Sequence, residues 1–86
     1  MTREDIVRRV HATLLREFDV TEGALRPEAR LVDDLGLDSL DGIDLVVALE
    51  KEFRDAKVKI KEDQARTLVT LQAIYDFVES HQDAAA

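Results

Sequence analysis

The residues best suited to chemistry lie together in one segment, Asp33–Leu45, which reads DDLGLDSLDGIDL. This segment contains five aspartates and Ser39, which is one of only two serines in the chain. An apolar pattern of helical period follows it, so we expect Asp38 to cap a helix and Ser39 to lie in its first turn. The free N–H groups and positive dipole of a helix start would favour a phosphate esterified to the Ser39 hydroxyl.

Ser39 nevertheless allows two interpretations. Serine is a favoured residue at helix starts, and Asp-Ser-Leu alone is too common a sequence to indicate a function. If Ser39 is functional, it is better suited to modification by another enzyme than to catalysis. The chain has no GxSxG elbow, and neither histidine lies near Ser39 in sequence to act as a base. We therefore expect no catalytic residue and predict a protein that is not an enzyme.

The chain contains no cysteine and only two histidines, His11 and His81. The lack of cysteine excludes disulfides, thiolate nucleophiles and cysteine-based metal sites within this sequence. The two histidines are seventy residues apart, so we expect them to be solvated or capping residues and predict no metal site. Any thiol chemistry would need a thiol from outside the sequence.

The net charge of −7 is concentrated in one part of the chain. Residues 33–52 carry seven acids and one base, whereas residues 1–32 are balanced and residues 54–66 are net positive. A nucleic-acid partner is disfavoured because phosphate backbones select basic faces. The acidic segment favours a basic protein surface as its partner.

Length and hydropathy predict one soluble domain over residues 1–86, with residues 83–86 as a frayed tail. No apolar run approaches the ~20 residues that a membrane span needs, so no membrane association is expected. The first residues, MTREDIVRRV, are charged and do not resemble a signal peptide. We expect a cytoplasmic monomer, since no exposed heptad seam is visible.

Periodicity predicts an all-α fold, a small four-helix bundle. Three of the helices are long, and the third in chain order is short. The first helix should span Arg3–Phe18, with Thr2 and Asp5 forming a capping box. Its inward side is predicted to carry Ile6, Val7, Val10, Leu14 and Phe18.

Five further segments complete this prediction. Residues 19–38 should form a long loop with a helical turn near Glu28–Leu31, held to the core by Val20, Leu25, Leu31 and Leu35. The second helix should run from Asp38 or Ser39 to about Phe53, and RDAKVKIKED should be a loop, although KVKIK alone would also suit a strand. A brief helix is expected at Glu62–Arg66. A last helix should run from a Thr70 cap to about Ser80, with Leu71, Ile74, Phe77 and Val78 inward.

The predicted second helix has two apolar faces. At about 100° per residue, one face is an ordinary core stripe made of Leu45, Val46, Leu49 and Phe53. The other, which we call the second stripe, consists of Leu40, Ile43 and Val47. Either the fold covers this helix on more than one side, or the second stripe is a docking surface with acidic flanks. Periodicity alone does not choose between them.

The segment DDLGLDSLDGIDLVVALEKEF, Asp33–Phe53, resembles the signature of acyl carrier proteins, as do the first helix and the closing TLQAIYDFVESHQ. The resemblance covers about residues 2–82 and is greatest to the discrete carriers of fatty-acid and type II polyketide synthesis. It implies a four-helix carrier in which a separate phosphopantetheinyl transferase, using its own Mg²⁺, attaches 4′-phosphopantetheine from coenzyme A to Ser39. The thiol of that arm would carry acyl groups as thioesters, which agrees with the absence of cysteine.

The resemblance also implies a docking surface on the second helix. The transferase, ketosynthases and other acyl-transferring enzymes would present basic surfaces to a set of residues made of Asp38, Leu40, Asp41, Ile43, Asp44, Val47 and Glu50. The space between the helices would be able to hold an acyl chain. The alternative is an acidic helical adaptor that binds a basic partner and carries no prosthetic group.

Two features depart from the family pattern. Gly42 lies inside the recognition helix, where family members usually have a side chain. The loop 54–63 is rich in lysine and longer than usual, whereas housekeeping fatty-acid carriers have a shorter, acidic one. These departures favour a specialised carrier over a housekeeping one.

Overall fold

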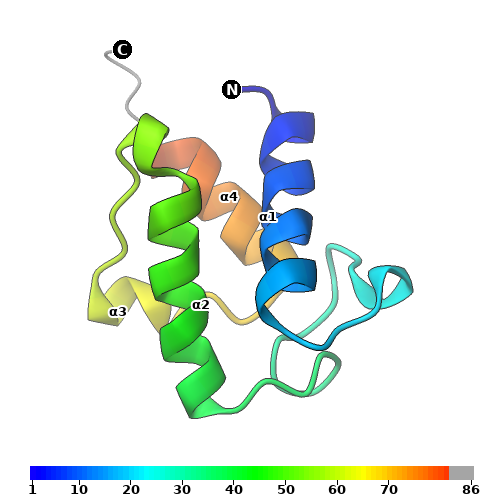
Figure 1. Ribbon diagram of the computed structural model, residues 1–86. Coiled ribbons are helices and arrows are strands. Elements are labelled where there is room, and N and C mark those ends of the chain that lie inside the picture. Colours follow the sequence, from blue (N-terminus) through cyan, green and yellow to red (C-terminus); the bar gives the residue numbers. More distant parts are fainter. Residues whose placement is uncertain (82–86) are drawn as a thin grey trace.

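The computed structural model describes residues 1–81, which form four α-helices and no strand (Figure 1). The α-helices are α1 (Arg3–Glu17), α2 (Ser39–Glu52), α3 (Glu62–Ala65) and α4 (Leu71–His81), and two 3₁₀ turns are η1 (Glu22–Ala24) and η2 (Arg54–Ala56). Helices α1 and α2 run in opposite directions, and α1 packs against both α2 and α4. The predicted all-α bundle with a short third helix is confirmed.

The start of α1 follows from its capping box. Thr2 Oγ1 accepts a hydrogen bond from the Asp5 N–H at 3.2 Å, and an Asp5 carboxylate oxygen accepts one from the Thr2 N–H at 3.3 Å. These bonds satisfy donors that a helix start leaves without intrahelical partners. The bond that the Asp5 carboxylate accepts from the Thr2 N–H also lowers the pKa of Asp5.

The core lies between α1, α2 and α4. Its most buried side chains come from all three helices and from the segment after α2, and include Ile6, Val10, Leu14, Leu49, Phe53, Val58, Leu71 and Ile74. Val7 and Phe18 are partly buried against this core, so the inward side predicted for α1 is confirmed. Tyr75 is only 2% exposed and is a core residue that the sequence prediction left out.

An ion-pair cluster joins α1 to the far end of α2. The Arg9 guanidinium contacts a carboxylate oxygen of Glu52 and one of Asp55, each at 2.8 Å, and lies over the Phe53 ring at 4.7 Å from its centroid. The hydrogen bond from Arg9 lowers the pKa of Asp55. Because Arg9 is largely covered, this cluster fixes how the C-terminal end of α2 sits on α1.

The long connection between α1 and α2 is tied to the segment before α4. The Leu31 N–H donates to the Val69 carbonyl at 2.9 Å, and the Leu71 N–H donates to the Ala29 carbonyl at 3.1 Å. These bonds form an isolated bridge centred on Arg30 and Thr70. The apolar residues predicted to hold this loop are buried or packed against the core.

The helical turn predicted at Glu28–Leu31 is wrong. Residues 29–31 pair in an extended form with residues 69–71, and a hydrogen-bonded turn follows them, in which the Asp34 and Leu35 N–H groups donate to the Arg30 carbonyl. A short helical turn instead forms earlier, at Glu22–Ala24. The partner segment lies about forty residues further along the chain, where local sequence patterns do not reveal it.

The segment after α2 is a loop and not a strand, as predicted. Val58 and Ile60 are buried while the alternating lysines face solvent, which explains the strand-like pattern of KVKIK. A Glu50 carboxylate oxygen accepts a hydrogen bond from the Ile60 N–H at 2.8 Å. This bond holds the loop against α2 ahead of α3.

Helix α4 begins as predicted, with Thr70 Oγ1 accepting a hydrogen bond from the Ala73 N–H at 3.1 Å. Its four predicted inward residues, Leu71, Ile74, Phe77 and Val78, are buried. The predicted frayed tail, residues 83–86, lies outside the described residues. Across residues 1–81, none of the helices has the length and apolar character needed to cross a bilayer.

The two apolar faces of α2 should differ sharply in their contribution to stability. Leu49 is fully buried, so Leu49→Ala should lower the free energy of unfolding by about 2–5 kcal/mol. Val47 is 45% exposed, and Val47→Ala should change the free energy of unfolding by less than about 0.5 kcal/mol. Urea denaturation of the two variants measures this difference. Equal losses would contradict the assignment of the two faces.

Candidate functional site

Helix α2 begins with a capping box built from two aspartates. An Asp38 carboxylate oxygen accepts a hydrogen bond from the Asp41 N–H at 2.9 Å, and an Asp41 carboxylate oxygen accepts one from the Asp38 N–H at 3.2 Å. The chain reaches this cap through Gly36, whose φ of +72° favours glycine, and through buried Leu37. The predicted cap at Asp38 is confirmed.

This cap places Ser39 at the first position of α2, where its side chain is exposed. Among residues 1–81, no side-chain or backbone group forms a hydrogen bond with the Ser39 hydroxyl. The start of α2 and the start of α1 lie at opposite ends of the molecule (Figure 1). The Ser39 hydroxyl is therefore accessible to a second protein.

Two grooves open beside Ser39. One, of about 500 Å³, lies between α2 and α3 and has mostly apolar walls, among them Leu45, Val46 and Leu68. The other, of about 330 Å³, lies between the start of α2 and the segment before α4. The residues that line both grooves are Leu31, Ser39, Gly42, Arg66 and Leu68. Ser39 thus lies at the edge of both.

The second stripe is not covered by the fold. Leu40 is 70% exposed, Ile43 is 62% exposed and Val47 is 45% exposed, and no element among residues 1–81 packs over them. This excludes the interpretation in which the chain itself wraps α2 on more than one side. An exposed apolar row on one helix face is typical of surfaces that bind partners.

The acidic residues predicted to flank the second stripe have unequal surroundings. Asp44 is exposed, while Asp38 and Asp41 cap the helix. Glu50 is partly buried and accepts a hydrogen bond from the Ile60 N–H, so it also has a structural role. Beyond Glu50 the surface turns basic, in a groove of about 630 Å³ lined by Lys51, Arg54, Lys57 and Lys59. Asp41 and Asp44 therefore supply the negative charge of the first two turns of α2, whereas Glu50 and Glu52 near its end are bonded to the Ile60 N–H and to Arg9.

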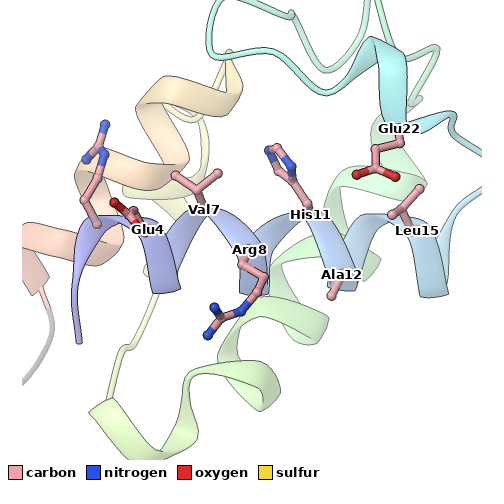
Figure 2. Close-up of a pocket in the computed structure, with 8 residues that line it drawn as sticks. Glu4, Val7, Arg8, His11, Ala12, Leu15 and Glu22 are labelled. Atoms are coloured by element: carbon pink, nitrogen blue, oxygen red, sulfur yellow. The ribbon is translucent and has the colours of Figure 1, made fainter.

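His11 is not the solvated or capping residue that the sequence suggested. It is half-buried on α1, and its Nε2 is hydrogen-bonded to the Tyr75 hydroxyl. Burial lowers the pKa of His11, against a smaller opposing effect of Glu22, and raises the pKa of Tyr75 to about 12. Figure 2 shows His11 and Glu22 facing a groove of about 510 Å³ along α1. The buried partner Tyr75 comes from α4, which explains why the sequence alone did not reveal it.

His81 is exposed at the end of α4. Its Nδ1 lies 2.9 Å from the Phe77 carbonyl oxygen, and its ring stacks on Phe77. Both histidines are thus bonded to α4, and neither forms a contact with Ser39. Within residues 1–81, no three histidine or acidic side chains gather closely enough to hold a metal ion.

A family comparison identifies the kind of site that this geometry forms. The model of the family described as "phosphopantetheine attachment site" matches residues 8–78. The chain belongs to this family. It is therefore a carrier protein with a covalently attached 4′-phosphopantetheine, and the resemblance to acyl carrier proteins is confirmed. Carrier domains of this family are in general not catalysts.

The residues at the start of α2 fit this prosthetic group. The carrier needs an accessible hydroxyl, and the grooves beside Ser39 leave room for a long substituent. Ser39 as the attachment residue and the second stripe as a docking surface stay predictions of the sequence, which did not include Arg66, a residue that lines both grooves with Ser39. No local signal links the two residues, because the loop between α3 and α4 brings Arg66 to the grooves.

Gly42 should be a stability defect and not a packing requirement. A Cβ added at Gly42 would meet no atom within 4 Å, so Gly42→Ala should gain about 0.5–1 kcal/mol and raise Tm by about 2–8 °C. Gly36→Ala is the matched control. Its added Cβ also meets open space, but its φ of +72° should make alanine destabilising. Thermal unfolding followed by circular dichroism measures both, and a lower Tm for Gly42→Ala would contradict the expectation.

Proposed function

We propose that Ser39 carries the phosphopantetheine arm and that this protein delivers acyl groups to enzymes of fatty-acid, polyketide or related lipid synthesis. The observation that supports Ser39 is a comparison of the two serines. Ser39 is exposed and lies inside the matched range, residues 8–78, whereas Ser80 lies outside it. The Ser80 hydroxyl also donates to the Asp76 carbonyl at 2.8 Å.

Loading requires a separate transferase, which we expect to use coenzyme A and Mg²⁺. The Ser39 oxygen forms a bond to phosphorus, the bond to the nucleotide half of coenzyme A breaks, and the serine proton passes to a base of the transferase. Neither His11 nor His81 contacts Ser39, so neither histidine is placed to act as that base. The positive dipole at the start of α2 favours the negative charge that the ester places there.

The bound arm supplies a thiol that holds acyl groups as thioesters. This protein contributes attachment and presentation: Ser39 lies at one end of the molecule and keeps the cargo at a high effective concentration near each active site. The largely apolar groove of about 500 Å³ between α2 and α3 offers a place for an acyl chain between deliveries.

Partner enzymes dock, on this proposal, along the exposed face of α2. Leu40, Ile43 and Val47 supply exposed apolar area, while Asp38, Asp41, Asp44 and Glu50 attract basic surfaces and set the register. The basic groove at the far end of α2 and the lysine-rich loop that forms part of it favour a specialised pathway. We place the protein in the cytoplasm as a monomer.

The attachment site is tested by loading each serine variant. Wild-type protein, Ser39→Ala and the matched control Ser80→Ala are incubated with coenzyme A, Mg²⁺ and a broad-specificity phosphopantetheinyl transferase. Intact-protein mass spectrometry should show one phosphopantetheine group on the wild type and on Ser80→Ala, and none on Ser39→Ala. An undiminished mass gain on Ser39→Ala would overturn the assignment. No gain on folded wild-type protein would favour the acidic adaptor.

The docking surface is tested through the kinetics of the same reaction. Ile43→Ser removes exposed apolar area beside Ser39 and should raise KM for the carrier by about threefold to tenfold with little change in kcat. Leu15→Ser is the matched control, because Leu15 is 41% exposed but lies on α1. Equal KM values for the two variants would show that the second stripe does not bind the transferase.

A further inference from the structure

We propose that Arg66 pairs with the phosphate on Ser39 once the arm is attached, and that it leaves Glu62 to do so. This inference rests on the proposed attachment at Ser39. It makes Arg66 a positioning residue, which holds the root of the arm against the mouths of the two grooves.

Arg66 and Ser39 border the same two grooves. Arg66 directly follows α3 and is its C-cap residue. It lines both grooves that open beside Ser39, and Ser39 also lines both. A group attached to the Ser39 hydroxyl therefore starts in a space that Arg66 borders on either side.

The charges around the two grooves also favour Arg66. Of the residues from 1–81 that line them, Arg66 is the only base, whereas Asp38 and Glu62 are acidic. The start of α2 adds Asp41 and Asp44 nearby in the helix. A phosphodiester at Ser39 carries a negative charge into these acidic surroundings, so the one cation at the edge of the grooves is its natural counter-ion.

Arg66 can also change partners at little cost in free energy. Its guanidinium Nη2 lies 2.9 Å from a Glu62 carboxylate oxygen, and the two side chains are 75% and 86% exposed. Exposed pairs of this kind contribute little to stability. A guanidinium can bind two phosphate oxygens at once, whereas Arg66 contacts Glu62 through one nitrogen.

Gly42 leaves open space in the grooves that Ser39 and Arg66 share. It lines both grooves, and a Cβ built on it would meet no atom within 4 Å. A side chain at this position would take up some of that space. This gives a physical use to the residue at which the sequence departs most visibly from related carriers.

The test compares loaded and unloaded protein for the wild type, Arg66→Gln, Arg66→Lys and Lys59→Gln. Lys59 is an exposed base that lines neither groove and serves as the matched control. Each protein is loaded with coenzyme A and a broad-specificity transferase, and intact mass confirms the loading. Thermal unfolding and the ³¹P NMR shift of the attached phosphate, at low and high NaCl concentration, are then measured.

The quantity compared is the Tm of the loaded protein minus the Tm of the unloaded protein. This difference should be about 1–4 °C lower in Arg66→Gln than in the wild type. Arg66→Lys should recover part of this difference, and Lys59→Gln should behave as the wild type. The ³¹P shift should differ between the wild type and Arg66→Gln at low salt, and this difference should shrink at high salt. If the wild type and Arg66→Gln show equal Tm changes on loading and equal ³¹P shifts, this inference is wrong, while the proposed function stands. Failure of the wild type to load would overturn the proposed function, and this inference with it.

Discussion

The reciprocal bonds between Asp38 and Asp41 are the constraint on which the rest of the site depends. They fix the residue at which α2 begins. Because each helical residue turns by about 100°, burial of Leu45, Leu49 and Phe53 in the core leaves Leu40, Ile43 and Val47 outside. The same bonds leave Ser39 at the first exposed position of the helix. A start one residue later would place Ser39 before the first turn of the helix and not in it.

The rest of the chain holds this helix from both ends. At its C-terminal end, Arg9 binds Glu52 and Asp55 and covers Phe53. At its N-terminal end, the long loop is bonded through Ala29 and Leu31 to the segment before α4, which brings Arg66 to the grooves beside Ser39. The fold therefore joins a rigid helix to a short, exposed α3 at the point where the arm is attached in our proposal. Attachment, docking and the placement of the arm all use this one end of the molecule.

The features that could be predicted from the sequence are those set by near neighbours. Capping boxes at Thr2 and Asp38 join residues three apart, and the apolar faces of α1, α2 and α4 follow from helical period. The features that could not be predicted need partners from distant segments. Ala29 and Leu31 pair with Val69 and Leu71, which replaces the helical turn expected there. In the same way, His11 meets Tyr75 across the fold, and Arg66 reaches the grooves beside Ser39 through a loop whose course no local pattern records.

The central claim is that Ser39 carries the prosthetic group in the cell. The most direct measurement is fragmentation mass spectrometry of the protein isolated from the cell that makes it. Our account predicts one phosphopantetheine group, with or without an acyl thioester, on the peptide that contains Ser39. A folded protein that is isolated without any modification of Ser39, or with the group on Ser80, would contradict it.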